Sequence, residues 1–245
     1  MNEADFSFYK KEVLIPFKIA KKGEDEFILR NKQIHQRGDQ CVKMLNLLLS
    51  IHIGEKVYDA YNLDAHFDLE QLQGRMDMTR VAVVGHSFGG GTSVCALAKD
   101  TRFKCAVALD AWMHPLEREL ITKVQQPVLF VNSDKFQWPM NLVKMKKMES
   151  RFMDRIMLFL RGTVHQSQGD FPFLLPPLFS RILEVRGKTE PKIAMQLSNR
   201  ASLAFLRKHL DIPDRTDWWG LLEGKDDRVI IGTNAPLRRC SVGII

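Results

Sequence analysis

The residue of this chain best suited to nucleophilic chemistry is a serine between two glycines, in the run Gly85-His86-Ser87-Phe88-Gly89. The run follows the apolar, β-branched stretch 81–84, which is typical of a buried strand, and precedes a segment with helical spacing. At a sharp turn between strand and helix, a serine hydroxyl projects above the sheet, and small residues at Gly85 and Gly89 leave room for that turn. We therefore predict that Ser87 is a nucleophile and that the backbone N–H of Phe88 stabilises an oxyanion.

A serine nucleophile needs a histidine base, and three histidines follow Ser87 in the chain. His165 lies in a glycine-containing loop just after the apolar stretch 155–160, which is the position that the strand–turn–helix motif requires of its base. His114 follows Ser87 too soon, and His209 lies near the end of an amphipathic helical segment, where a solvated cap is expected. His86 belongs to the turn itself, so we interpret it as a packed neighbour. His165 is the predicted base.

Two aspartates fit the third position of such a triad. Asp110 follows the predicted strand 105–109, and Asp134 follows the predicted strand 128–131. Either carboxylate is placed to orient an imidazole. Spacing alone slightly favours Asp134, because the later strand is the commoner site for the acid.

The elements that must position these residues alternate between strand and helix. This order predicts an α/β fold, with a mostly parallel sheet and helices on both of its faces, in a single domain over residues 1–245. Strands are predicted at 81–84, 105–109, 128–131 and 155–160, and residues 13–17 are also compatible with a strand. Helices are predicted at 31–53, directly after the Ser87 turn, at 141–154 and, as a short helix, at 64–73.

Composition excludes several classes of protein. The chain has 245 residues, of which 45% are hydrophobic and 27% charged, as in ordinary globular proteins. No apolar run reaches the ~18 residues of a membrane-spanning helix. The four cysteines, Cys41, Cys95, Cys105 and Cys240, form no zinc or disulfide motif, and Cys95 and Cys105 are expected to be buried.

The formal net charge of the chain is +7. Basic residues are spread along the sequence, with one denser patch at Lys144, Lys146, Lys147, Arg151 and Arg155. No aromatic-interleaved motif or basic recognition helix accompanies the patch, so nucleic acid is not an expected partner. A basic face that settles on a phospholipid surface is the favoured interpretation.

Three segments carry a resemblance to a known family: Gly-His-Ser-Phe-Gly-Gly at 85–90, Ala-Leu-Asp-Ala-Trp-Met at 108–113 and Gly-Thr-Val-His-Gln at 162–166. They resemble the platelet-activating factor acetylhydrolases, the lipoprotein-associated group VII phospholipases A2, which are serine lipases of the α/β-hydrolase fold. Residues 197–206, Trp218 and 222–224 look like the plasma type. The resemblance runs from about residue 25 to about residue 235.

The resemblance reverses the choice of acid. The aspartate of the Leu-Asp-Ala-Trp run is the family's triad member, which implies Asp110, whereas family members carry glutamate where this chain has Asp134. The implied triad is Ser87, Asp110 and His165, with Trp112 and Gln166 binding substrate. The aromatic residues Phe136, Trp138 and Phe171 are further candidates for the pocket wall.

The implied activity is that of a 1-alkyl-2-acetylglycerophosphocholine esterase. Such an enzyme hydrolyses the short or oxidised sn-2 acyl ester of phospholipids such as platelet-activating factor, without calcium, cofactor or metal. The expected partners are the phospholipid and a lipoprotein or membrane surface, and the oligomeric state is open. The apolar segment 174–185, flanked by Arg181 and Arg186, is either an interfacial helix or a core helix.

The chain departs from the family pattern before Ser87. No His-Gly-type loop that supplies a second oxyanion donor is found there, since His52-Ile53-Gly54 ends a predicted helix. We therefore expect an amino-terminally shortened member whose early strands are missing. The plasma form implies an extracellular location, although no signal segment is found, so a cytoplasmic location is the alternative. The alternative functions are a catalytically impaired lipid-surface or interaction protein that keeps the triad, and a generic carboxylesterase.

Overall fold

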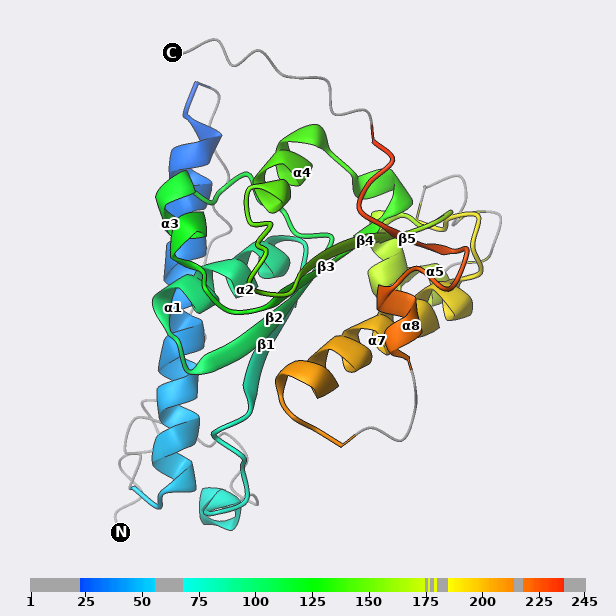
Figure 1. The fold of residues 1–245 in the computed structure, drawn as a ribbon. Coiled ribbons are helices and arrows are strands. Elements are labelled where there is room, and N and C mark those ends of the chain that lie inside the picture. The colour runs from blue at the N-terminus through cyan, green and yellow to red at the C-terminus, as the bar shows by residue number, and fades with distance from the viewer. Residues whose placement is uncertain are drawn as a thin grey trace.

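A computed structural model describes residues 23–55, 68–174, 176, 179, 185–213 and 218–235. Its centre is a five-stranded sheet in the order β1-β2-β3-β4-β5 (Figure 1). The strands are β1 (Val81–His86), β2 (Phe103–Leu109), β3 (Val128–Ser133), β4 (Arg155–Leu160) and β5 (Val229–Ile231). Strands β1 to β4 are parallel and β5 is antiparallel to β4. The mostly parallel sheet predicted from the sequence is confirmed, including all four of its predicted strands.

Helices cover both faces of this sheet, as predicted (Figure 1). One face carries α1 (Glu26–His52), α2 (Phe88–Lys99), α3 (Arg118–Lys123) and α4 (Pro139–Lys146), and the other carries α7 (Pro191–His209) and the short α8 (Trp219–Leu222). Ala106 and Ala108 of β2 face the first layer, while Cys105 and Val107 face the second. Because side chains alternate along a strand, β2 is buried on both faces, which explains its continuous apolar run.

The helix bounds differ from the prediction at two places. Helix α1 begins five residues early, at Glu26, because the Asp25 carboxylate accepts the N–H of Phe27 and caps the helix. Helix α4 ends at Lys146 and not at 154, and beyond it the Ser150 hydroxyl accepts the N–H groups of Phe152 and Met153 and forms a turn instead.

The smaller elements were predicted less well. The predicted helix at 64–73 is a 3₁₀ turn at Leu69–Leu72, with 64–67 outside the described residues. The possible strand at 13–17 also lies outside them. The three-residue β5 was missed because it is too short to show a pattern.

The outer edge of β1 is open in the described part of the chain, where β1 pairs only with β2. Its Val84 side chain is 53% exposed, whereas every residue of β3 is buried. An apolar strand with one free edge and a half-exposed face is unusual for a parallel sheet. None of the described helices is both long and apolar enough to cross a membrane.

The register of the sheet brings the carboxyl ends of its strands together. His86 of β1 aligns with Leu109 of β2, and Ser133 of β3 aligns with Leu160 of β4. The residue after β1 is Ser87 and the residue after β2 is Asp110, so both lie at the same edge of the sheet. Ligand sites of open parallel sheets form at this edge.

Candidate active site

Ser87 lies at a strained turn between β1 and α2. Its φ of 60° and ψ of −119° are rarely adopted by residues other than glycine. The turn is held by hydrogen bonds on both sides, because the Ser87 N–H donates to the carbonyl of Leu109 at 2.9 Å and the Ser87 carbonyl accepts the N–H of Trp112 at 2.9 Å. The neighbouring strand therefore keeps Ser87 in a conformation that an isolated turn would not retain.

The two glycines of the Ser87 motif are not equivalent. A Cβ atom on Gly85 would lie 2.1 Å from the carbonyl oxygen of Gly89, so the turn closes only with glycine at position 85. A Cβ atom on Gly89 would meet nothing within 4 Å. We expected both positions to need glycine. This is right for Gly85, whose missing side chain leaves room for the Gly89 backbone, and wrong for Gly89, where a side-chain carbon would meet no other atom.

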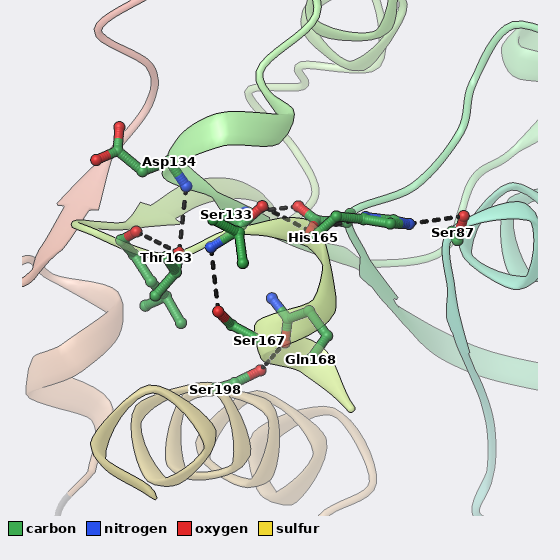
Figure 2. A network of polar contacts seen from close by, with 11 residues as sticks. Ser87, Ser133, Asp134, Thr163, His165, Ser167, Gln168 and Ser198 are labelled. Carbon is green, nitrogen blue, oxygen red and sulfur yellow. Dashed lines mark hydrogen bonds and ion pairs between the residues drawn. The ribbon is translucent and has the colours of Figure 1, made fainter. Parts of the chain in front are cut away.

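The structure brings the three predicted triad residues together, and Figure 2 shows His165 reaching toward Ser87. Ser87 Oγ lies 3.0 Å from His165 Nε2, and His165 Nδ1 lies 3.1 Å from Asp110 Oδ2. A hydroxyl, an imidazole and a carboxylate in this chain of contacts allow the imidazole to accept the serine proton while the carboxylate holds its orientation. The arrangement is therefore suited to nucleophilic attack on a carbonyl carbon.

The Asp110 carboxylate is fully buried and held by Ser133. The Ser133 backbone N–H donates to Asp110 Oδ1 at 2.5 Å, and the Ser133 hydroxyl donates to Oδ2 at 2.7 Å. With the contact to His165, both carboxylate oxygens have partners, as burial of a charge requires. Ser133 was not singled out in the sequence, where only its position directly before Asp134 could have drawn attention.

Asp134, the competing acid, has a different partner. Its Oδ2 accepts the N–H of Gly162 at 2.9 Å, and its backbone N–H donates to Thr163 Oγ1 at 3.2 Å. In Figure 2 its carboxylate points away from His165. Asp134 thus fastens the loop after β4 to the end of β3, and the preference for Asp134 from spacing alone is not supported by this geometry.

The loop that carries His165 is fixed by side-chain hydrogen bonds (Figure 2). Thr163 Oγ1 donates to the carbonyl of Leu160 at 2.6 Å, and Ser167 Oγ accepts the N–H of Val164 at 3.1 Å. Ser198 of α7 donates to Gln168 Oε1 at 2.7 Å, which ties the far end of the loop to the helix layer. His165 therefore sits on a braced loop, although it lies outside regular strand or α-helix.

Two rings enclose the His165 imidazole. The Phe136 ring stacks on it at a centroid distance of 4.1 Å, and the His86 ring lies on it at 4.4 Å. Burial, followed by the proximity of His165, lowers the pKa of His86. His86 is thus a packed neighbour of the base, as the sequence interpretation held.

The first turn of α2 offers free backbone donors beside Ser87. Gly90 and Gly91 donate their N–H groups to the Ser87 carbonyl at 3.1 and 3.3 Å. No backbone acceptor among the described residues takes the N–H of Phe88 or Gly89. Phe88 N–H is therefore available for an oxyanion, with the positive end of the helix behind it.

A cavity of about 1190 Å³ opens onto Ser87 and His165. The predicted Trp112 lines it together with Phe136 and Trp138, whereas Gln166 and Phe171 do not. Gln166 follows His165 within a 3₁₀ turn, His165–Gln168, and successive side chains in such a turn diverge by about 120°. Gln166 is therefore not part of the wall of this cavity, and its role in binding substrate stays a prediction.

Three charged residues of the cavity wall were not identified in the sequence as pocket residues: Lys135, Arg186 and Lys188. Residues 186–188 approach the His165 loop closely, since a Cβ atom on Gly187 would lie 2.1 Å from the carbonyl oxygen of Gly162. The Thr189 N–H also donates to that carbonyl at 2.9 Å. The three cations share one wall because residues far apart in the sequence pack together, so their spacing in the sequence did not predict the cationic wall.

Neither His114 nor His209 is hydrogen-bonded to Ser87 within the described part of the chain, where His165 holds that place. His114 stacks on Trp112 with ring centroids 5.9 Å apart. His209 ends α7, but its side chain is only 12% exposed and pairs with Asp154 at 3.2 Å, so it is not the solvated cap that was expected. The only described cluster of three close potential metal ligands is His86, Asp110 and His165, and hydrogen bonds to Ser87 and Asp110 engage both ring nitrogens of His165.

Two members of the predicted basic patch are structural. Lys144 donates to the carbonyls of Met113, His114 and Leu116, and its burial lowers its pKa. Arg155 donates to the carbonyl of Val124. Lys146, Lys147 and Arg151 remain exposed, so the basic surface is smaller than predicted.

The predicted interfacial segment 174–185 is described only in part. Helix α5 (Phe171–Leu174) precedes it with Phe171, Phe173 and Leu174 more than half exposed, and Phe179 is 59% exposed. Most of the segment, residues 175, 177–178 and 180–184, lies outside the described residues, as does Cys240. Cys95 and Cys105 are buried as predicted, and burial raises their pKa to about 12.

Comparison with known proteins gives consistent matches. Residues 2–229 match the family model described as platelet-activating factor acetylhydrolase, isoform II. A platelet-activating factor acetylhydrolase of Gallus gallus is 42% identical over 237 residues, which are 96% of this chain and 54% of that protein. The Bos taurus protein of the same name is 43% identical over 215 residues, 87% of this chain and 48% of that protein. The chain thus spans about half the length of the curated relatives it matches.

A solved structure supports the fold. A ferulic acid esterase from Streptomyces cinnamoneus superposes with a TM-score of 0.57 at 17% sequence identity, covering 83% of this chain and 56% of the esterase. At this identity the likeness concerns the α/β-hydrolase fold alone.

Proposed function

The chain belongs to the platelet-activating factor acetylhydrolase family, and on this premise we propose that it hydrolyses the sn-2 acyl ester of phospholipids through Ser87. The preferred acyl groups are short or oxidatively truncated, and the products are a lysophospholipid and a short carboxylic acid. The observation that carries the proposal is the chain of contacts Ser87–His165–Asp110, whose first two members line a cavity of about 1190 Å³.

The proposed reaction has two halves. Ser87 Oγ attacks the ester carbonyl carbon while His165 Nε2 accepts its proton, and the Phe88 N–H stabilises the oxyanion. The ester C–O bond then breaks, and His165 returns the proton to the departing lysophospholipid oxygen. Water, deprotonated by His165, attacks the acyl-enzyme and releases the carboxylic acid with regeneration of Ser87. Asp110 holds the imidazole throughout and stabilises its positive charge.

This mechanism takes its nucleophile from a side chain, so we propose that it needs no calcium. The test is acetate release from a 2-acetyl phosphocholine ether lipid by the purified chain, with Ser87→Ala as the matched control and a parallel assay in EDTA. We expect wild-type turnover that persists in EDTA and background rates for Ser87→Ala. Turnover by a folded Ser87→Ala variant, or abolition by EDTA, would contradict the proposal.

A catalytically impaired lipid-surface protein is the second candidate. One observation favours this candidate. Within the described residues, the only oxyanion donors identified beside Ser87 are the N–H groups at the start of α2. Loss of one oxyanion donor typically lowers turnover about 10²–10³-fold. Saturable binding of short-chain phospholipid with no ester cleavage, in a protein folded by circular dichroism, would select this candidate.

The location that we propose is extracellular, at a lipoprotein or membrane surface. The contact with a lipid surface is supported by the exposed apolar side chains of Phe171, Phe173 and Leu174, which lie beside the His165 loop and are suited to shallow insertion among lipid headgroups. Co-sedimentation with phosphatidylcholine vesicles tests the surface contact. Replacing all three residues with serine should reduce the bound fraction, and equal binding would refute this use of α5.

A further inference from the structure

The cavity at Ser87 is charged as well as apolar. Lys135, Arg186 and Lys188 line its wall together with one carboxylate, that of Asp134. Three cations against one anion leave the wall with two net positive charges. The Asp134 carboxylate accepts the Gly162 N–H at 2.9 Å and, among the described residues, forms no ion pair with any of the three cations.

Among the residues that the structure describes, none of the three cations forms an ion pair or a side-chain hydrogen bond, whereas several cations elsewhere do. Arg102 pairs with Asp100, for example, and Lys208 pairs with Asp154. Lys135 and Lys188 are exposed and Arg186 is half-buried, so their charges face the cavity and solvent. The wall is therefore positioned to attract an anion from outside.

The positions of the cations are fixed by the backbone that carries them. The Lys135 N–H donates to the carbonyl of Thr163 at 3.2 Å, two residues before His165. Residues 186–188 lie against Gly162, and the Thr189 N–H donates to the same Gly162 carbonyl. All three side chains thus start from backbone held directly against the His165 loop, and their charges stay within reach of a substrate bound at Ser87.

We propose that this cationic wall makes the site selective for esters with a net negative charge near the scissile bond, such as phospholipids with an anionic headgroup. A phosphodiester alone supplies one negative charge, which a choline group cancels. The wall would therefore favour a glycerol headgroup over a choline headgroup at equal acyl chains. This inference rests on the proposed function, because it concerns the substrate of the same Ser87 site.

The experiment compares soluble short-chain phospholipids below their micelle concentrations, so that adsorption of a basic protein to an anionic surface plays no part. Two are dibutyryl lipids, one with a choline and one with a glycerol headgroup, and the third has a choline headgroup, butyryl at sn-1 and a carboxylate-ended glutaryl group at sn-2. The readout is the ratio of kcat/KM for each anionic substrate to that for the zwitterion. We expect a wild-type ratio of roughly threefold to tenfold, the effect of two to three exposed charge pairs.

The variants separate the wall from net charge. Lys135→Gln/Arg186→Gln/Lys188→Gln should bring the ratio close to one, whereas the charge-preserving Lys188→Arg should keep it. Lys146→Gln/Lys147→Gln removes two exposed charges at the end of α4, outside the cavity, and should leave the ratio unchanged. Raised salt should lower the wild-type ratio, because exposed charges are screened. Which anionic substrate gives the higher ratio tells whether the headgroup or the acyl end meets the wall.

A wild-type ratio of one for both anionic substrates would overturn the inference while the proposed function stands. The same holds if the triple variant and the α4 control change the ratio equally. Absence of hydrolysis of all three substrates would overturn the proposed function and the inference with it. A general loss of folding in a variant would lower kcat/KM for all three substrates together, and circular dichroism would identify it.

Discussion

Replacing Gly85 with alanine puts a methyl group where the structure holds the backbone of Gly89. The new carbon would lie 2.1 Å from the Gly89 carbonyl oxygen and 2.3 Å from its carbon, whereas ordinary contacts begin near 3.4 Å. The turn must then open by about 1 Å, and overpacking of this kind typically costs about 1–3 kcal/mol. Gly89→Ala is the matched control, since its methyl group meets nothing within 4 Å and alanine favours a helix over glycine by about 0.5–1 kcal/mol.

The two variants should therefore differ by about 1.5–4 kcal/mol in free energy of unfolding, which for a domain of this size is roughly 3–16 °C in Tm. Differential scanning calorimetry measures this difference, and the labelling rate with a fluorophosphonate measures the state of Ser87. Gly85→Ala should label at least about tenfold more slowly, because a nucleophile displaced by 1 Å loses its alignment. Equal stabilities and labelling rates for the two variants would refute the account of the turn.

The remaining predictions concern the triad and its neighbours. Asp110→Asn should lower kcat by about 10³–10⁴-fold because the imidazole loses its orientation, whereas Asp134→Asn should change kcat less than tenfold; the reverse order in ester hydrolysis would reinstate Asp134 as the acid. Ser133→Ala removes one hydroxyl donor from the buried Asp110 carboxylate and should lower kcat by about tenfold, with Ser202→Ala in α7 as a serine control away from the His165 loop, and equal effects would contradict a role for Ser133. The lowered pKa of His86 means that the unfolded chain binds its proton more readily than the folded one, so stability should fall as pH drops below about 6.5, and His86→Asn should lessen that fall; identical pH dependence of Tm would refute this. Cys95 and Cys105, whose pKa is raised to about 12, should resist iodoacetamide at pH 8 until the chain unfolds, as peptide mass spectrometry can show.

Local pattern was sufficient for the parts of the molecule where each element carries its own signal. The four central strands are apolar runs between polar turns, and the strand–Gly85–Ser87–helix order is short-range, so both were predictable. His165 was predictable for the same reason, because its place after the last parallel strand is a feature of chain order.

Tertiary packing decided what the sequence left open. Asp110 and Asp134 follow neighbouring strands in the same way, and only the register of β2 and β3, which puts Ser133 against the Asp110 carboxylate, separates them in space. The cationic wall could not be predicted for the same reason. Lys135 and Lys188 are 53 residues apart, and the close approach of Gly187 to Gly162 places both side chains at one cavity. After helix α4 ends at Lys146, backbone turns at Met148 and Glu149 and the Ser150 hydroxyl replace the predicted helix, which hydrophobic spacing does not reveal.

Incubation of the folded chain with a fluorophosphonate, followed by peptide mass spectrometry, tests whether Ser87 is an activated nucleophile. We expect one covalent adduct, on the peptide that contains Ser87, which forms much more slowly in His165→Ala and is absent in Ser87→Ala. An adduct on another residue, or a folded wild-type chain that forms none, would contradict it.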